Sequence, residues 1–318
     1  MYRLGVDLGG TNIVAGVVDE NFKIIATAKR KTNFPRPAEE IVKDIAAAVK
    51  DAIANAKIKV SDIKSFGIGS PGAINSKDGI VERAENLGFY NFPIAKLLKE
   101  YTGFDFCVEN DANAAAYGEY IAGAGKGYKN IVAVTLGTGV GGGVIIDGKI
   151  FSGANYAGAE LGHTVITMDG EICSCGRNGC WEAYASATAL IRQTKQAMKR
   201  YSDSIMWELC NKDINNVSGR TAFDAMRKGD KAGKIVVDKY IQYIAVGVAN
   251  CINIFQPEVL CIGGGISKEG DTLINPIKAY VDGDDFARNM SSKTLIKAAK
   301  LGNDAGIIGA AFLGELQK

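Results

Sequence analysis

The sequence predicts an α/β protein with two related lobes. Strand-like and helix-like segments alternate along the chain, and 318 residues, 47% of them hydrophobic, are enough to form two cores. The third observation is an internal repeat, in which residues 8–19 align without a gap onto residues 136–147. Each copy has the pattern of strand, glycine turn and strand. Duplicated sheets of this kind are expected to leave a cleft, with one glycine turn facing it from each lobe.

The N-terminal part of the chain is expected to begin with a β-hairpin. Two short apolar runs surround the glycine turn at residues 8–12, and no helical pattern follows that turn. The helix predicted for residues 39–56 has apolar residues at helical spacing, which gives it one face that can cover a sheet. The expected strands are residues 2–7, 13–18, 65–69 and 104–108, and an alanine-rich helix is expected at residues 112–121.

The remainder of the chain is expected to place helices around a second sheet. Strands are predicted from residue 131 and at residues 259–262, with helices at residues 183–200, 231–255 and 304–316. The long helix should end before Pro257, whose ring disfavours helical geometry in the preceding residue. The last helix is expected to pack back against the first lobe. The predicted lobes are residues 1–118 plus 300–318 and residues 119–299, with hinges near residues 118–127 and 300–304.

Composition and charge limit the partners of the protein. The 37 basic and 35 acidic residues nearly balance, so no broad positive field attracts nucleic acid or an anionic membrane. The N-terminus lacks the apolar core of a signal peptide, and no stretch of eighteen apolar residues occurs. We therefore expect a cytoplasmic protein that acts on a small molecule. A homo-oligomer, either a dimer or a tetramer, is also expected.

The single histidine of the chain lies shortly before a cysteine-rich run. His163, Cys173, Cys175 and Cys180 fall within eighteen residues. Zn²⁺ is bound tetrahedrally by Cys and His, and three thiols with one imidazole leave no position open for water or substrate. We therefore predict a structural zinc site. The alternatives are a buried histidine near unrelated cysteines, or a disulfide; the four other cysteines are expected to be buried hydrophobes in a reducing compartment.

The two glycine turns are suited to phosphate binding, because glycine lets backbone amides approach a phosphate where a Cβ would obstruct it. Residues 137–142 also satisfy the dinucleotide fingerprint G-x-G-x-x-G. That motif requires a helix to open at the glycines, whereas residues 143–148 have the pattern of a second strand and an Asp-Gly turn. No Walker sequence occurs, which disfavours a P-loop. A triphosphate between the two turns is the preferred interpretation.

These motifs occur in the order seen in the ROK family of repressors, open-reading-frame proteins and sugar kinases. They are Asp7-Leu-Gly-Gly-Thr-Asn12, Asn110-Asp111, residues 136–143, Glu160-Leu-Gly-His163, the run from Cys173 to Cys180 with Glu182, and Gly263-Gly-Gly265. The chain resembles this family over almost its whole length, and residues 179–188 resemble the bacterial ROK glucokinases in particular. The resemblance implies the actin-like, ribonuclease-H-like fold, with ATP and sugar bound between the lobes.

Phosphoryl transfer to a hydroxyl requires positioning, charge neutralisation by Mg²⁺ and a carboxylate that accepts the hydroxyl proton. Asp111 is predicted to be this base, because it stands just past a strand end and matches the catalytic aspartate of the family. The alternative is that Asp111 only caps the helix that follows it. Asn110 is expected to orient the adjacent sugar hydroxyl, and its alternative is an ordinary turn asparagine.

The nucleotide is expected to contact both glycine turns. Asp7 is predicted to bind Mg²⁺ through water, since magnesium gives up its hydration shell reluctantly. The residues predicted to surround ATP and its Mg²⁺ are Asp7, Gly9, Gly10, Thr11, Asn12, Gly137, Thr138, Gly139, Gly263, Gly264 and Gly265. The alternatives are tight hairpins without a ligand and, for the last three residues, a plain connection from a strand to a helix.

The sugar is expected to bind beside the zinc loop. Binding of one imidazole nitrogen to a metal fixes the other nitrogen as a donor, and the resemblance implies that His163 also contacts sugar hydroxyls. Glu160 and Glu182 bracket the loop and can each accept hydrogen bonds from two hydroxyls; solvated surface charges are the alternative. The residues predicted to contact the sugar are Gly72, Asn110, Asp111, Glu160, His163 and Glu182.

The motifs together predict ATP-dependent phosphorylation of glucose at its 6-hydroxyl. N-acetylmannosamine, N-acetylglucosamine and fructose are alternative substrates, because family members that act on them share the same motifs. A sugar-binding regulator is the non-enzymatic alternative. A repressor of this family would need a DNA-reading helix-turn-helix ahead of the first phosphate motif, which starts here at residue 7, so a repressor is not expected.

Overall fold

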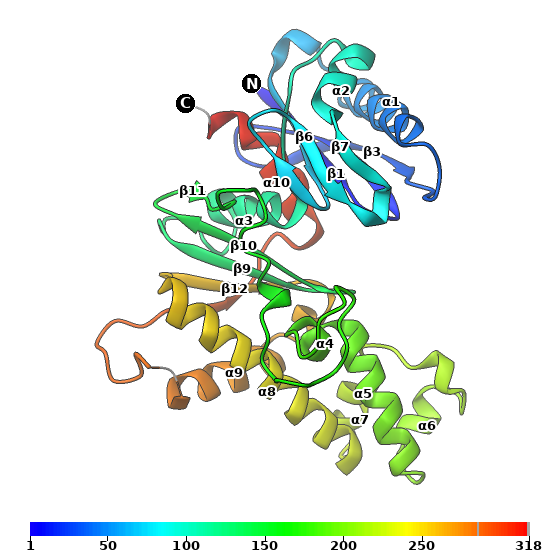
Figure 1. Cartoon of the computed structure of the whole chain (residues 1–318), viewed down its shortest axis with the longest axis vertical. Coiled ribbons are helices and arrows are strands. Elements are labelled where there is room, and N and C mark those ends of the chain that lie inside the picture. The colour runs from blue at the N-terminus through cyan, green and yellow to red at the C-terminus, as the bar shows by residue number, and fades with distance from the viewer. Residues whose placement is uncertain (285, 317–318) are drawn as a thin grey trace. The chain divides into compact units, whose positions relative to one another are not determined.

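The protein forms two compact units in the computed structural model, which describes residues 1–284 and 286–316 (Figure 1). The first unit contains Met1–Ala133, Gly142–Ala159 and Ala299–Lys318, and the second contains Val134–Gly141 and Glu160–Ala298. This division groups residues 119–133 and 142–159 with the N-terminal part of the chain, whereas the boundary expected from the sequence follows residue 118. The lobes expected from the sequence stay a prediction.

A five-stranded sheet forms the centre of the first unit. Its strands are β1 (Tyr2–Leu8), β2 (Asn12–Val18), β3 (Ile24–Lys31), β4 (Ile63–Ser70) and β8 (Phe106–Asn110), in the order β3-β2-β1-β4-β8. The predicted hairpin around the first glycine turn is confirmed, because β1 and β2 pair in antiparallel fashion. Strands β1, β4 and β8 are parallel. Their carboxyl ends therefore lie along one edge of the sheet.

Different helices cover the two faces of this sheet. On one face, alternate residues of β1 are buried in a core with α1 (Ala38–Ala56), which matches the predicted helix. On the other face lies α10 (Ala305–Phe312), where a Cβ on Gly5 would come within 2.0 Å of the Ile307 carbonyl oxygen. Successive residues of a strand point to opposite faces. The glycine at position 5 therefore lets the last helix pack on the first sheet, as predicted, although that helix ends earlier than expected.

The first unit also contains a smaller sheet that was not expected from the sequence. Strands β5 (Ala73–Asn75), β6 (Ile80–Ala84) and β7 (Phe89–Phe92) form a three-stranded antiparallel sheet, and α2 (Ile94–Thr102) follows it. The predicted alanine-rich helix is confirmed as α3 (Asp111–Ala122), which directly follows β8.

The two predicted hinge segments meet at one buried carboxylate in the first unit. Glu119 of α3 accepts hydrogen bonds from the backbone amides of Ala124 at 2.7 Å, Lys300 at 3.1 Å and Leu301 at 2.7 Å. The side chain is 3% exposed. Both predicted hinge segments are therefore held by a single residue of α3. Hinge motion at these segments stays a prediction.

The second five-stranded sheet repeats the strand order of the first. Its strands are β9 (Ile131–Leu136), β10 (Val140–Ile146), β11 (Lys149–Ile150), β12 (Val259–Gly263) and β13 (Leu295–Ala298), in the order β11-β10-β9-β12-β13. The hairpin β1–β2 corresponds to β9–β10, and the pair β4–β8 corresponds to β12–β13. This agreement supports the internal repeat. It also confirms that a strand, and no helix, follows the second glycine turn.

Helices make up most of the second unit. They are α4 (Glu182–Ala185), α5 (Ala187–Arg200), α6 (Met206–Leu209), α7 (Thr221–Arg227), α8 (Lys231–Phe255) and α9 (Asp271–Asp284). The prediction of one helix over residues 183–200 is wrong, because Ser186 has extended backbone angles and its hydroxyl oxygen caps α5 by accepting from the Ala189 amide at 3.1 Å. Helix α8 ends before Pro257 as predicted, with Gln256 in the left-handed conformation.

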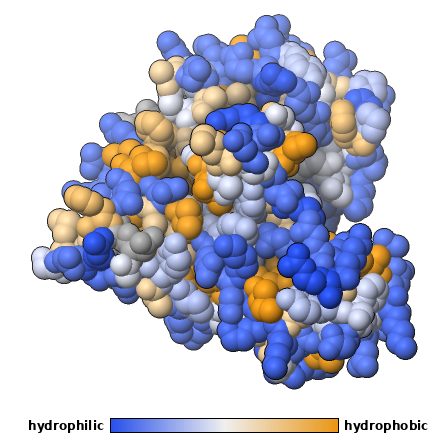
Figure 2. Space-filling view, turned by 60° about the horizontal axis from the view of Figure 1, so that its bottom comes forward, coloured by the Kyte–Doolittle hydropathy of each residue, from blue (hydrophilic) through white to orange (hydrophobic). Residues whose placement is uncertain are grey.

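Helix α8 is the one helix of the described residues that is long and apolar enough to cross a membrane. This is weak evidence for a membrane span, because 61% of its apolar window is buried inside the protein and core helices of soluble proteins have the same composition. Tyr240, Ile244 and Val248 of α8 are fully buried. The face drawn in Figure 2 is largely hydrophilic, and its apolar side chains form small separate groups.

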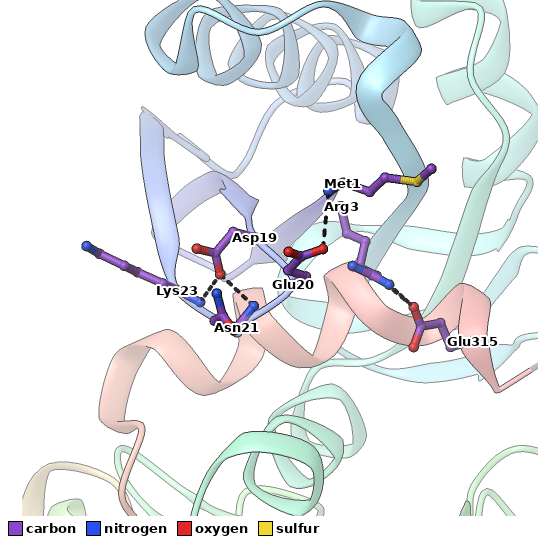
Figure 3. A network of polar contacts seen from close by, with 7 residues as sticks. All are labelled: Met1, Arg3, Asp19, Glu20, Asn21, Lys23 and Glu315. Atoms are coloured by element: carbon purple, nitrogen blue, oxygen red, sulfur yellow. Dashed lines mark hydrogen bonds and ion pairs between the residues drawn. The ribbon is translucent and has the colours of Figure 1, made fainter.

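The two ends of the chain support the same sheet (Figure 3). Arg3 of β1 donates from Nε to Glu315 at 2.7 Å, and its guanidinium carbon lies 4.3 Å from the centre of the Phe312 ring. In the nearby turn between β2 and β3, the carboxylate of Asp19 accepts from the backbone amide of Asn21 at 2.8 Å. The first strand and the last helical segment are thus joined by both charge and stacking.

Candidate active site and metal cluster

The first glycine turn joins β1 to β2 and is held by one buried threonine. The Gly9 amide donates to the Asn12 carbonyl at 2.8 Å, which closes the turn. The hydroxyl of Thr32, a fully buried residue, donates to the Gly9 carbonyl at 2.6 Å, and the Thr32 amide donates to the Thr11 carbonyl at 3.0 Å. Gly10 and Thr11 are exposed. The turn is therefore fixed from the protein side, and its tip faces solvent.

Two polar groups next to this turn are short of partners. Asn12 Oδ1 is buried and has no hydrogen-bond donor among the described residues. Burial raises the pKa of the Asp7 carboxyl above its usual value, and among the described residues no cation offsets this shift. A Cβ on Gly306 would lie 3.2 Å from the Asp7 carboxyl carbon, so the glycine there leaves space beside the carboxyl group. A hydrated cation would satisfy both groups, since its water donates hydrogen bonds and its charge favours the ionised carboxylate.

The turn from β8 to α3 carries the predicted base. Asn110 is the N-cap of α3, and its Oδ1 accepts from the amides of Ala112 at 2.9 Å and Asn113 at 3.1 Å. Its Nδ2 donates to the Gly72 carbonyl at 3.0 Å. Asp111 is the first residue of the helix, and its Oδ1 accepts from the Ala112 amide at 2.9 Å. The capping role that was the alternative for Asp111 is thus filled by Asn110.

Strand pairing places the predicted base, Asp111, and the predicted Mg²⁺ contact, Asp7, on one edge of the first sheet. Asp7 of β1 pairs with Gly69 of β4, and Gly69 pairs with Glu109 of β8. Because neighbouring strands lie about 4.8 Å apart, the backbones at Asp7 and Glu109 are separated by roughly 10 Å. Asp111 follows Glu109 by two residues. The sequence placed both carboxylates at strand ends, and the structure adds their order across the sheet.

The second glycine turn joins β9 to β10 and rests on the start of α5. The Gly137 carbonyl accepts from the Ala187 amide at 2.8 Å. The Thr138 carbonyl accepts from the Thr188 hydroxyl at 2.8 Å. Both donors lie in the first turn of α5, so this helix fixes the two residues at the tip of the glycine turn.

The third glycine segment packs beside the second turn. A Cβ on Gly264 would come within 2.4 Å of the Leu136 carbonyl oxygen, and Gly264 has a φ of 86°, so this position requires glycine. A Cβ built on Gly137 or Gly265 would have nothing within 4 Å. The predicted nucleotide residues of the second unit therefore lie together, with open space beside two of their glycines.

The four predicted metal ligands come together in the second unit. One ligand atom from each of His163, Cys173, Cys175 and Cys180 lies within 4.8 Å of the others. His163 Nδ1 is 3.5 Å from Cys173 Sγ, and Cys175 Sγ is 3.7 Å from Cys180 Sγ. Typical zinc bond lengths give tetrahedral edges of roughly 3.5 Å between nitrogen and sulfur and roughly 3.8 Å between two sulfurs. The donor set therefore fits a zinc ion, and the cysteines are free thiols without a disulfide.

Tight turns shape the loop that carries these ligands. The Gly176 amide donates to the Cys173 carbonyl at 3.0 Å, and a Cβ on Gly179 would lie 1.7 Å from the Thr167 carbonyl oxygen. Cys173 and Cys180 are buried, whereas Cys175 is exposed. Burial, with hydrogen bonding to neighbouring thiols, raises the pKa of Cys180 to about 12. A bound cation would stabilise its thiolate.

Glu182 connects the cysteine loop to the second glycine turn. Its Oε1 accepts from the Ser174 hydroxyl at 2.7 Å and lies 3.7 Å from Cys173 Sγ. Its Oε2 accepts from the Val140 amide at 3.1 Å, and a Cβ on Gly139 would come within 2.3 Å of this oxygen. Both oxygens thus have partners within the protein. The predicted contact of Glu182 with a sugar stays a prediction.

Glu160 and His163 lie on one short turn that packs on β10. The His163 amide donates to the Glu160 carbonyl at 3.1 Å, and the Glu160 side chain is exposed. A Cβ on Gly162 would come within 2.1 Å of the Val140 carbonyl oxygen. Because His163 Nδ1 faces Cys173, Nε2 is the ring nitrogen that remains for another partner.

The structure thus gathers the predicted residues into one group in each unit. The first unit brings together Asp7, Gly9, Gly10, Thr11, Asn12, Gly72, Asn110 and Asp111. The second unit brings together Gly137, Thr138, Gly139, Glu160, Gly263, Gly264, Gly265, Glu182 and the metal cluster. Glu109, a buried carboxylate next to Asn110, was not predicted from the sequence. Its position directly between an apolar strand and the predicted base was the signal that could have found it.

The two sheets with the same strand order, each with a glycine turn after its central strand, define a protein of the actin-like class. The chain belongs to the ROK family, whose model matches residues 3–316. It is 39% identical over 314 residues to a glucokinase of Thermotoga maritima, with 98% of this chain and 96% of the relative covered. It is 38% identical over 315 residues to a glucokinase of Streptomyces coelicolor, with the same coverage of 98% and 96%.

A solved structure has the same fold. The crystal structure of a ROK family glucokinase from Streptomyces griseus, in complex with glucose and AMPPNP, matches with a TM-score of 0.81 and 36% identity. The match covers 98% of this chain and 99% of that one. The actin-like, ribonuclease-H-like fold expected from the motifs is thereby confirmed.

Proposed function

We propose that the protein is a glucokinase, which transfers the γ-phosphoryl group of ATP to the 6-hydroxyl of glucose. The similarity to ROK glucokinases over nearly the whole chain supports this function. The observation that carries the proposal is the turn between β8 and α3. There, Asn110 caps the helix and Asp111 occupies the first helical position at the carboxyl edge of the sheet.

Asp111 is the proposed general base. The positive end of the α3 dipole favours its ionised form, which the base needs at the start of the reaction. Asp111 accepts the proton of the sugar hydroxyl as that oxygen bonds to the γ-phosphorus, and ADP leaves with the electrons of the broken P–O bond. The Asn110 amide group has a second N–H besides the one that Gly72 accepts. This N–H is proposed to donate to the sugar.

The nucleotide is proposed to lie on the glycine turns. The phosphates contact Gly9, Gly10, Thr11, Asn12, Gly137, Thr138 and Gly139, and Gly263, Gly264 and Gly265 take the adenosine side. Mg²⁺, when bound, neutralises phosphate charge. Asp7 would hold this ion through water, and the unused Oδ1 of Asn12 would accept from a water of the same shell. The space beside Gly306 is consistent with that arrangement.

The metal cluster is proposed to be a structural zinc site. Zn²⁺, when bound, fills its coordination with His163, Cys173, Cys175 and Cys180, so it fixes the loop and takes no part in the chemistry. His163 would then donate from Nε2 to a sugar hydroxyl. Glu160 would accept from sugar hydroxyls, and Gly72 would line the other side of the sugar. Glu182 would join them by exchanging one of its present partners for the sugar.

The proposed enzyme works in the cytoplasm as a homo-oligomer, either a dimer or a tetramer. Its seven free cysteines agree with a reducing compartment, and light scattering of the purified protein tests the assembly. The catalytic test is an ATP-dependent phosphorylation screen with metal content measured on the same preparation. The screen covers glucose, mannose, fructose, allose, N-acetylglucosamine and N-acetylmannosamine. Preference for an N-acetylated hexosamine or fructose would replace glucose in the proposal, and sugar binding without turnover would indicate a regulator.

The role of Asp111 is tested by Asp111→Asn, for which we expect kcat to fall by about 10²–10⁴-fold, the usual contribution of a general base. Sugar binding, measured by calorimetry, should persist. Asp105→Asn is the matched control, because Asp105 is an exposed residue ahead of the same strand and pairs only with Lys99 in the described structure. Near wild-type kcat in Asp111→Asn would show that another group accepts the proton.

A further inference from the structure

Glu109 is a buried carboxylate that the proposed mechanism does not use. It lies on β8 directly before Asn110 and is 6% exposed. Its Oε1 accepts from the Asn110 amide at 2.9 Å and from Asn113 Nδ2 at 3.1 Å. Its Oε2 accepts from the Ser76 hydroxyl at 2.9 Å and from the Ser152 hydroxyl at 3.5 Å. Four donors from three segments of the first unit, the β8–α3 turn and the segments at Ser76 and Ser152, therefore converge on one carboxylate.

All four donors are neutral, and no ion pair of Glu109 is found among the described residues. A carboxylate offers about four lone-pair sites, so these donors fill it. Removal of an ionised carboxylate from water without a cationic partner costs free energy, and the four hydrogen bonds offset that cost. Loss of the carboxylate would leave these donors unpaired, so Glu109 fixes the geometry of the groups that donate to it.

We infer that Glu109 is a positioning residue for the proposed base, an inference that rests on the proposed function. The residues on both sides of Asp111 are held by Glu109: the Asn110 amide before it and the Asn113 side chain after it. The Asn110 side chain then fixes the first turn of α3 and reaches Gly72. Asp111 thus lies between two residues that are held by a carboxylate outside the proposed sugar and nucleotide contacts.

The other oxygen of Glu109 ties the base to two segments that lead to proposed sugar contacts. Ser76 lies in the turn between β5 and β6, shortly after Gly72. Ser152 lies shortly before Glu160, in a loop that closes on itself through a 2.9 Å hydrogen bond from the Gly158 amide to the Ser152 carbonyl. Glu109 therefore holds the turn of the proposed base together with the β5–β6 turn and the loop at Ser152, all within the first unit.

A pocket of 250 Å³ gives access to this carboxylate. Ser76, Glu109, Ser152 and Tyr156 are among the residues that line it. Truncation of Glu109 would leave its donors facing this pocket. A small carboxylate from solution could then enter and accept the same hydrogen bonds, which makes chemical rescue a direct readout of positioning.

The main test compares three enzymes with glucose and ATP. For Glu109→Ala we expect kcat to fall by about 10²-fold, since a misplacement of about 1 Å is enough for such a loss, while both KM values change less than threefold. Added acetate should restore kcat at least tenfold, and sodium chloride at equal ionic strength should not. Glu109→Gln should stay within about tenfold of wild type, because its carbonyl can accept from the asparagines and its amide can donate to the serine hydroxyls.

Controls separate positioning from folding. Ser65→Ala removes another hydroxyl bond of the same sheet, from Ser65 to the Ala311 carbonyl at 2.8 Å, and should leave kcat unchanged. If Glu109→Ala does not fold, the double variant Ser76→Ala/Ser152→Ala takes its place, with an expected kcat loss of about tenfold at a Tm near wild type. Wild-type kcat in that double variant would overturn the inference.

Two further outcomes would also overturn it. One is a Glu109→Ala enzyme whose folded fraction, determined by active-site titration, has wild-type kcat. The other is a loss that acetate leaves unchanged while Glu109→Gln is equally impaired. Either result leaves the proposed function standing as long as the wild-type enzyme phosphorylates glucose. A wild-type enzyme inactive on every sugar of the screen would instead defeat the proposed function, and the inference with it.

Discussion

The two glycine turns have the same hairpin form but are held by different parts of the protein. The first is closed by its own backbone and by Thr32, which lies next to β3. The second rests on α5 and on Glu182, which also bonds to Ser174 of the cysteine loop. Two hairpins of the same form can thus depend to very different degrees on segments elsewhere in the chain. The first turn is a property of its own sheet, whereas the second depends on the segment between β11 and β12.

The metal cluster is expected to produce the largest difference between the two turns. A structural zinc ion contributes apparent binding free energy of about 10 kcal/mol or more, so its removal by a chelator should abolish activity and disorder the cysteine loop. Hydrogen exchange should then rise at β9–β10 and stay unchanged at β1–β2. Mildly acidic pH should promote metal loss, because protons compete for the thiolates and the imidazole.

Cysteine variants give the control for this comparison. Cys175→Ser removes one proposed ligand, whereas Cys107→Ser alters a half-buried cysteine outside the cluster. Only the first should lower the zinc content and activity. Full activity in metal-free protein would show that the loop holds its shape without an ion.

Asp7, at the first turn, is expected to support activity while it lowers the stability of the metal-free protein. Asp7→Asn should lower kcat substantially, by about 10²-fold if the residue holds Mg²⁺ as proposed. The pKa of Asp7 is higher in the folded than in the unfolded protein, so the metal-free fold disfavours the ionised carboxylate. As pH rises from the unfolded pKa to the folded pKa, ionisation of Asp7 increasingly favours the unfolded state and lowers stability. Asp7→Asn should therefore raise Tm at pH 7 in the absence of Mg²⁺. The gain should vanish below the unfolded pKa of about 4.

Thermal melts at pH 7 and pH 3.5 test whether Asp7→Asn raises Tm at neutral pH and leaves it unchanged at acidic pH. A lower Tm for Asp7→Asn at neutral pH would mean that the carboxylate has a stabilising partner in the fold. Retained activity would mean that a different group holds the ion.

Glu182 is expected to give a smaller effect, on the second turn and on the sugar. Glu182→Ala releases both the Val140 amide and the Ser174 hydroxyl, so we expect KM for ATP to rise by about tenfold, equivalent to about 1.4 kcal/mol. KM for glucose should rise as well, because the proposed sugar contact is lost. Ser174→Ala removes only the bond on the cysteine side and should change KM for ATP less. Steady-state kinetics that show a rise in KM for glucose alone would assign Glu182 solely to the sugar.

Two threonines provide the finest comparison between the turns. Thr32 and Thr188 each donate one hydroxyl to a carbonyl of a glycine turn, but Thr32 is fully buried and Thr188 is exposed. Thr32→Val should lower the free energy of unfolding by about 1–2 kcal/mol, because it leaves a carbonyl short of its donor. Thr188→Val should cost less than about 0.5 kcal/mol, since water replaces the lost donor. Equal costs in urea titrations would contradict the difference in how the turns are held.

The sequence predicted the features that depend on local spacing. The metal ligands lie within one short run, so their convergence followed from ligand chemistry and chain length. The first hairpin and helices α1, α3 and α8 had clear periodicity or clear end signals, such as Pro257 after α8. Ser186, by contrast, was read as an interior residue of one helix, although serine often caps a helix start.

Features that depend on tertiary contacts could not be predicted. Strand β3 is an edge strand in which exposed residues alternate with half-buried ones, so its apolar pattern is weak. The contacts of Glu109 and Glu182 join segments far apart in sequence, and no spacing rule pairs a glutamate with Ser152 or Val140. Both glutamates lie next to a recognisable motif in the sequence, but their hydrogen-bond partners become known only from the fold.

The packing of α10 on Gly5 has a consequence for how the polypeptide is made. Strand β1 leaves the ribosome long before α10, the helix that covers one face of its sheet. A nascent chain therefore carries an uncovered sheet face until α10 has emerged, and exposed apolar surface favours aggregation during that time. The first unit cannot be completed before α10 has been translated, and loss of Ala305–Phe312 would leave that face of the sheet uncovered.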